Sequence, residues 1–185
     1  MNYLFLVYCF IILLSALTGG LFPLFKNWKE STLRHFISFG AGVLLGAAFF
    51  HMIPESFEKI GAKASYLIFS GFFVLFLLEK FIIVHACDMQ ECTAHHTLGI
   101  SSFFGLSIHS ITDGIALGSG SGDGALTFAI FLAIIAHKPP CALALSSVLI
   151  RDNFTKKAVI ILAVLFSLMV PLGAVATIYT SKKYP

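Results

Sequence analysis

Long apolar runs dominate this chain of 185 residues and leave little sequence for anything else. Six of them reach the roughly 20 residues that a helix needs to cross a bilayer core. The runs cover residues 3–25, 33–53, 65–84, 98–118, 125–150 and 158–179. Charged residues make up only 11% of the chain, whereas a soluble domain carries about 25%. The sequence therefore predicts an all-α membrane protein, a polytopic bundle of about six transmembrane helices that forms one domain over residues 1–185.

The first run and the basic connections bear on topology. The run over residues 3–25 lacks a basic leading region and is longer than a signal-peptide core, so we interpret it as a membrane span. Lys and Arg residues in the connections number six on one predicted side and four on the other. This bias favours an extracytoplasmic N-terminus. The net charge of +3 is too small and too dispersed to predict nucleic-acid binding.

Two of the predicted spans carry side chains that can bind a metal ion. Residues four apart lie on one face of a helix, so His109 shares a face with Asp113, and His137 with Cys141. Imidazole, carboxylate and thiolate are ligands that zinc and similar divalent ions accept. Two helices that point these groups at one centre would form a metal site at membrane depth, which predicts a transport pathway.

The same two spans contain charges that lipid would not tolerate. Asp113 or Lys138 would each cost about 2.5–3.5 kcal/mol at the centre of a lipid-exposed helix. We therefore expect both side chains to face the bundle interior and to be paired or solvated there, and Lys138 can pair with Asp113. The neighbouring Pro139–Pro140 pair removes two backbone donors, so the carbonyls four positions earlier lose their helical partners beside the predicted site. A structural reading, in which these polar groups only pin helices together, stays open.

The third connection, residues 85–97, is a short Cys/His-containing loop that the predicted orientation places in the cytoplasm. Thiolates and imidazoles this dense can hold a soft or borderline metal ion, and a solvated polar loop is the alternative. The predicted loop ligands are Cys87, Cys92, His95 and His96.

Four segments of the chain carry more specific patterns, at residues 40–55, 77–80, 109–118 and 137–145. In this order they resemble the signatures of the second to fifth helices of the ZIP (Zrt/Irt-like protein) family of divalent metal transporters. The resemblance covers most of the chain. It implies zinc as the transported substrate, with Fe²⁺, Mn²⁺ and Cd²⁺ as open alternatives, and no prosthetic group.

The resemblance also implies roles for individual residues between and around the fourth and fifth helices. The positions that match primary ligands are those of His109, His137 and Cys141. Asp113 and Ser110 match a pair that in some members helps to form a second, adjoining metal site. The positions that match polar pathway residues are His51, Glu55 and Glu79.

The chain departs from the family pattern at two positions and in length. Cys141 stands where the family usually has glutamate, which would favour softer ions or weaken transport. Lys138 stands at a ligand position of two-metal members, so its ammonium would replace the second cation and leave one site. Family members usually have eight spans, and this chain offers about six.

These observations predict a transporter that moves a divalent cation, chiefly zinc, into the cytoplasm, and not an enzyme. One alternative is a transport-inactive metal sensor or a partner subunit of a full-length transporter. An intramembrane zinc hydrolase is a further alternative, although the chain has no His-Glu-x-x-His motif. The expected partners are divalent metal ions and the lipid bilayer of the plasma membrane or an intracellular vesicle, with a homodimer kept open.

Overall fold

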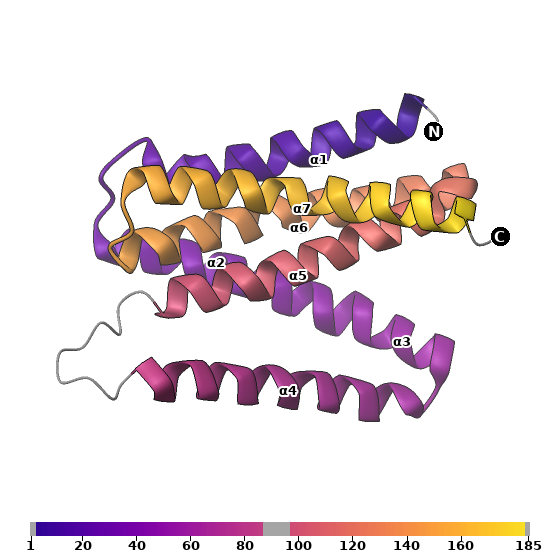
Figure 1. The fold of residues 1–185 in the computed structure, drawn as a ribbon, viewed down its shortest axis with the longest axis horizontal. Helices are drawn as coiled ribbons and strands as arrows, with labels where there is room; N and C mark the ends of the chain where they lie inside the picture. The colour runs from indigo at the N-terminus through magenta and orange to yellow at the C-terminus, as the bar shows by residue number, and fades with distance from the viewer. Residues whose placement is uncertain (1–2, 87–96, 184–185) are drawn as a thin grey trace.

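The computed structural model of the protein describes residues 3–86 and 97–183, which form a bundle of long helices (Figure 1). These residues contain no strand. Five helical stretches are long and apolar enough to cross a membrane, and Lys63–Val74 is a shorter apolar helix. α1 begins and α7 ends at the same end of the bundle (Figure 1). The prediction of a helical membrane bundle is confirmed.

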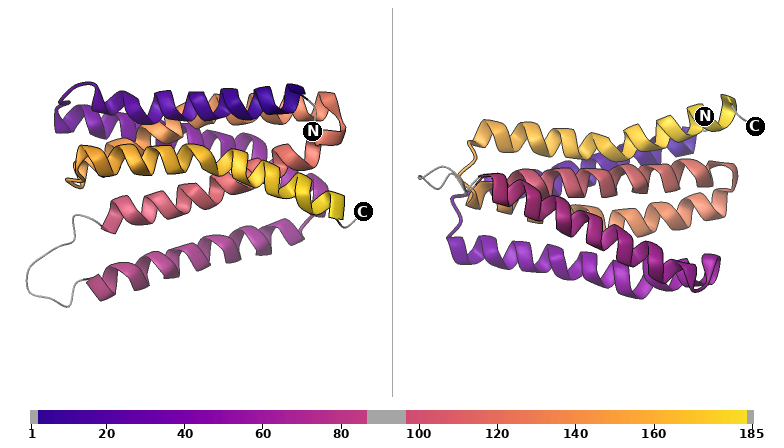
Figure 2. Two further views of the ribbon diagram at one scale, coloured as in Figure 1. Left: turned by 45° about the horizontal axis from the view of Figure 1, so that its top comes forward. Right: turned by 60° about the horizontal axis from the view of Figure 1, so that its bottom comes forward.

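The helix bounds lie close to those of the predicted apolar runs. In space, α4 lies at the edge of the bundle (Figure 2). In chain order they are α1 (Tyr3–Leu21), η1 (Phe22–Leu24), α2 (Glu30–Ala47), η2 (Ala48–Met52), α3 (Ile53–Ile60), α4 (Lys63–Ala86), α5 (Thr97–Ser119), η4 (Gly120–Gly122), α6 (Gly124–Arg151) and α7 (Lys156–Lys183).

The second predicted span is longer than expected and is interrupted. Its apolar run covers residues 33–53, but the helical stretch extends over Glu30–Ile60. Pro54 has no N–H to donate to the carbonyl four residues earlier, and the wider π-helical turn η2 directly precedes it. The stretch ends at Gly61, whose φ of 59° suits a residue without a Cβ.

The turn between α6 and α7 is held by backbone and side-chain hydrogen bonds. Asn153 adopts a left-handed conformation with a φ of 60°, and its N–H bonds to the carbonyl of Ile150. The N–H of Phe154 bonds to the carbonyl of Leu149, which completes a Schellman motif at the end of α6. The buried carboxylate of Asp152 accepts a 2.5 Å hydrogen bond from the N–H of Gly99, so this turn also caps the start of α5.

We expect Asp152→Ala to lower the free energy of unfolding by about 1–2 kcal/mol, because the substitution removes the cap and leaves a buried N–H unpaired. Asp152→Asn keeps an acceptor oxygen and should retain most of that stability. Denaturant unfolding of the protein in detergent micelles would measure both changes. An alanine variant as stable as the wild type would show that the bond to Gly99 contributes nothing.

Glycines bring the helix backbones close to α6 at its proline pair. A Cβ on Gly19 of α1 would overlap the carbonyl oxygen of Pro139, and one on Gly40 of α2 would lie 2.6 Å from that of Pro140. Small residues permit this approach between membrane helices. α6 is therefore packed between α1 and α2 at the level of its two prolines.

Two buried apolar clusters fill the bundle, one on each side of its middle. The first joins α1, α5, α6 and α7 and consists of Phe5, Tyr8, Cys9, Ile12, Leu117, Phe131, Ile134, Val170 and Ala174. The second joins α6 and α7 and consists of Cys141, Ala142, Leu145, Leu149, Val159 and Phe166. The helix positions between these clusters carry the polar side chains.

Candidate metal site between α5 and α6

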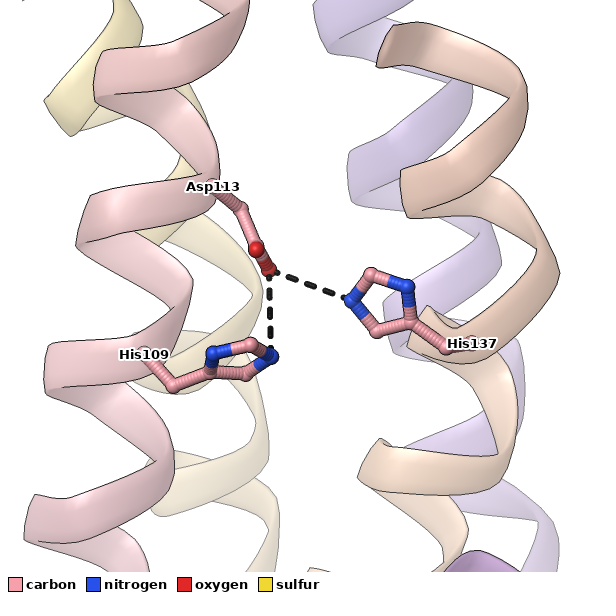
Figure 3. A group of neighbouring side chains, drawn as sticks. All are labelled: His109, Asp113 and His137. Carbon is pink, nitrogen blue, oxygen red and sulfur yellow. Dashed lines mark hydrogen bonds and ion pairs between the residues drawn. The ribbon is translucent and has the colours of Figure 1, made fainter. Parts of the chain in front are cut away.

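Three potential ligands converge where the middle of α5 faces the middle of α6 (Figure 3). His109 and Asp113 lie one turn apart on α5, and His137 reaches toward them from α6. The Nε2 atom of His137 lies 3.4 Å from Oδ2 of Asp113, and that of His109 lies 3.8 Å from the same oxygen. One ligand atom from each residue fits within 4.8 Å of the others.

A backbone carbonyl fixes the orientation of the His137 ring. Its Nδ1 lies 2.7 Å from the carbonyl oxygen of Ala133, one turn earlier on α6. A carbonyl oxygen only accepts, so Nδ1 donates, and in the neutral ring Nε2 carries the lone pair. Nε2 faces Oδ2 of Asp113 at 3.4 Å, so it donates to this oxygen from a protonated ring or offers its lone pair to a metal ion from a neutral ring. Metal-bound histidines commonly donate their other ring N–H to a carbonyl oxygen in this way.

The spacing of the three residues suits a tetrahedral metal ion. Bonds of about 2.0–2.1 Å to zinc place neighbouring ligand atoms roughly 3.3 Å apart. The His137–Asp113 separation of 3.4 Å already matches this value, and His109 needs a small inward shift from 3.8 Å. The Nε2 atom of His109 is also buried and has no hydrogen-bond partner among the residues that the structure describes. Three protein ligands would leave one coordination position open for water or a passing ligand.

A buried lysine completes the surroundings of Asp113. Lys138 on α6 is fully buried, and its Nζ lies 3.7 Å from Oδ2 of Asp113. The same ammonium donates a 2.5 Å hydrogen bond to Oγ of Ser110 and lies 4.5 Å from the centroid of the Phe166 ring. The predicted pairing of Lys138 with Asp113 is present. Phe166 had no sequence signal, because it is one apolar residue among many on α7.

Two further predicted ligands lie close in sequence to the cluster but outside it. Cys141 is fully buried in the second apolar cluster and is not among the three residues whose ligand atoms converge. Ser110 accepts from the Lys138 ammonium, so its hydroxyl already has a cationic partner. Their roles as metal ligands stay predictions.

Apolar packing encloses the site along the axis of the bundle. On α6, His137 lies between Ile134 of the first cluster and Cys141 of the second. The side chains of His137 and Asp113 are only 12% and 10% exposed, and that of His109 is 25% exposed. A site with this little exposure excludes most water, so charges inside it interact strongly.

The pathway residues that the family resemblance implies lie on η2, α3 and α4. Glu55 on α3 forms an ion pair of 2.6 Å with Lys59 and is partly exposed. His51 and Glu79 belong to helical segments, but their side chains lie outside what the structure describes. The predicted loop ligands all lie outside the described residues, namely Cys87, Cys92, His95 and His96.

Comparison with known proteins agrees with this architecture. The model of the ZIP zinc transporter family matches residues 3–88 and 84–184. Zinc transporter ZIP9-B of Xenopus laevis is 24% identical over 208 residues, which cover 90% of this chain and 69% of that protein. Zinc transporter 3 of Arabidopsis thaliana is 24% identical over 213 residues, covering 94% of this chain and 62% of that protein. Zinc transporter 1 of Oryza sativa subsp. japonica is 43% identical over 51 residues, covering 27% of this chain and 14% of that protein.

The apolar helices and these matches define a multi-pass helical membrane protein. The chain belongs to the ZIP zinc transporter family, because the family model matches nearly its whole length. It spans about two thirds of the length of the two longer-matching relatives. No solved structure matches the chain significantly.

Proposed function

We propose that this protein carries zinc across a membrane into the cytoplasm through the site formed by His109, Asp113 and His137. One observation carries the proposal: two imidazoles and one carboxylate from α5 and α6 each bring a ligand atom within 4.8 Å of the others, with Nε2 of His137 only 3.4 Å from Oδ2 of Asp113. A divalent cation between these two atoms would bond to both. Nε2 of His109, which lies 3.8 Å from the same oxygen, would supply the third ligand.

The chemistry of the three ligands favours zinc over harder ions. Two imidazoles and one carboxylate suit zinc in tetrahedral geometry, whereas Mg²⁺ and Ca²⁺ prefer six or more oxygen ligands. Transport also needs an ion that binds firmly enough to be selected and weakly enough to leave. Lys138 beside Asp113 places a positive charge next to the ion and so limits the affinity.

The apolar clusters on both sides of the site suggest how the ion is held during transport. An ion bound beside His137 would be closed off along the bundle by Ile134 on one side and by the buried Leu145 on the other. Passage requires each cluster to open in turn. We propose that entry is from the side where α1 begins, because the basic connections favour an extracytoplasmic N-terminus.

The test is uptake of radioactive zinc into proteoliposomes that contain the full chain. We expect saturable uptake by the wild type and its loss in His109→Ala and His137→Ala, since each variant removes one of three ligands. His35→Ala is the matched control, because His35 is exposed on α2 and bonds to the carbonyl of Ser31 instead. Zinc binding without uptake in the wild type would instead support a sensor or a partner subunit. Wild-type uptake retained in both histidine variants would contradict the proposed site.

A further inference from the structure

We propose that Phe166 on α7 is a positioning residue for the metal site: its ring holds the Lys138 ammonium back from Asp113 and thereby keeps the carboxylate available to the ion. The inference rests on the proposed function of the site. It also assigns α7 a part in metal binding, although this helix contributes no ligand to the converging group.

The first step concerns the contacts of the buried ammonium. Lysine Nζ carries three N–H groups and no acceptor. The structure surrounds it with Oγ of Ser110 at 2.5 Å, Oδ2 of Asp113 at 3.7 Å and the Phe166 ring centroid at 4.5 Å. Only Asp113 among these three partners is charged. The Ser110 hydroxyl and the Phe166 ring are the uncharged groups that help to stabilise this fully buried ammonium.

The second step concerns the distance between ammonium and carboxylate. A direct charge-assisted hydrogen bond between such groups is about 2.7–2.9 Å long. Lys138 Nζ stays at 3.7 Å from Asp113, although Lys138 is fully buried and the Asp113 side chain is only 10% exposed. The ring of Phe166 attracts the cation toward α7, and this attraction is strongest when both groups are desolvated. Phe166 is itself fully buried in the second apolar cluster.

The third step concerns competition at one oxygen. Oδ2 of Asp113 is the atom that both histidines approach and also the carboxylate oxygen that pairs with the ammonium. A metal ion and Lys138 therefore compete for the same oxygen. Without the ring, the ammonium would close onto that oxygen, because Asp113 would be its strongest remaining partner. Loss of the ring should weaken metal binding even though no ligand is changed.

The experiment is a calorimetric titration with zinc alone, on the full chain in lipid nanodiscs. We expect Phe166→Leu to raise the Kd for zinc roughly tenfold, the effect of losing a desolvated cation–π contact. Phe166→Tyr keeps the ring face and should bind zinc nearly as the wild type does. Phe103→Leu is the matched control, because Phe103 packs against the same cluster, whereas the described cation–π contact of Lys138 is with Phe166. If Phe166→Leu does not fold, Phe166→Met offers a second aliphatic replacement.

The same substitution in a Lys138→Met variant separates a positioning role of Phe166 from a role in packing alone. In Lys138→Met the ammonium is gone, so adding Phe166→Leu should leave the zinc Kd of that variant unchanged. An equal weakening in both backgrounds, or no weakening in either, would overturn the role of Phe166 alone. Zinc binding that is absent from the wild type, or that survives His137→Ala, would instead overturn the proposed metal site and the inference with it.

Discussion

Asp113→Ala is expected to abolish zinc binding and to lower the free energy of unfolding by about 3–5 kcal/mol, the cost of leaving a buried charge without its partner. Asp113 supplies the carboxylate of the ligand group, and among the described residues it is the one carboxylate that pairs with the fully buried Lys138. Zinc titration and denaturant unfolding in detergent micelles measure the two losses separately.

Adding Lys138→Met to Asp113→Ala should separate the loss of stability from the loss of zinc binding. The double variant Asp113→Ala/Lys138→Met removes both charges, so its stability should return close to that of the wild type. Zinc binding should stay absent, because the carboxylate ligand is still missing. Asp123→Ala is the matched control: Asp123 caps α6 from an exposed position, so its loss should cost about 1 kcal/mol and leave zinc binding intact. A double variant that stays as unstable as Asp113→Ala would show that the lysine charge is not what destabilises the single variant.

The course of the chain was predictable because the bilayer fixes the length of a span. The predicted runs over 65–84, 98–118, 125–150 and 158–179 each lie within one helix, whereas the run over 3–25 covers α1 and η1 and the run over 33–53 crosses α2 and η2 into α3. The π-helical turn η2 was not predicted, because hydropathy reports where a helix is buried in lipid and not how it relieves a missing N–H at Pro54. The extension of this stretch to Ile60 was missed for a related reason, since α3 carries charged residues beyond the apolar run.

Helical spacing and the cost of buried charge predicted the central residues of the site, but they did not predict the residues packed around it. Spacing placed His109 with Asp113, and the cost of a buried charge predicted that Lys138 would pair with Asp113. Spacing also put Cys141 on the face of His137, but a shared face one turn away does not decide whether a short side chain reaches the centre. The contact with Phe166 depends on which residue of α7 lies at the level of Lys138, and this register comes only from packing.

The packing of α5 against α7 sets that register through glycines. A Cβ on Gly114 would overlap the carbonyl oxygen of Val170 and lie 2.8 Å from the backbone N of Ala174. Gly173 makes the reciprocal close approach to the carbonyl of Ile111. These contacts involve backbone atoms on both helices, so neither helix can yield by rotating a side chain.

Gly114→Ala should therefore push α5 away from α7 and cost about 3 kcal/mol of stability, near the upper end for overpacking. Gly105 on the same helix has nothing within 4 Å of the place that a Cβ would take, so Gly105→Ala should be neutral or stabilise α5 by up to about 1 kcal/mol. Unfolding of the two variants in detergent micelles gives the comparison.

The same pair of variants tests whether the α5–α7 spacing controls the metal site. His109 and Asp113 move with α5, whereas Phe166 moves with α7. Separating the helices should draw the ring away from Lys138, so Gly114→Ala should also weaken zinc binding, while Gly105→Ala should leave it unchanged. If Gly114→Ala lost stability but kept its zinc affinity, the ligand geometry would be set by α5 and α6 alone, and the helix spacing would matter only for the fold.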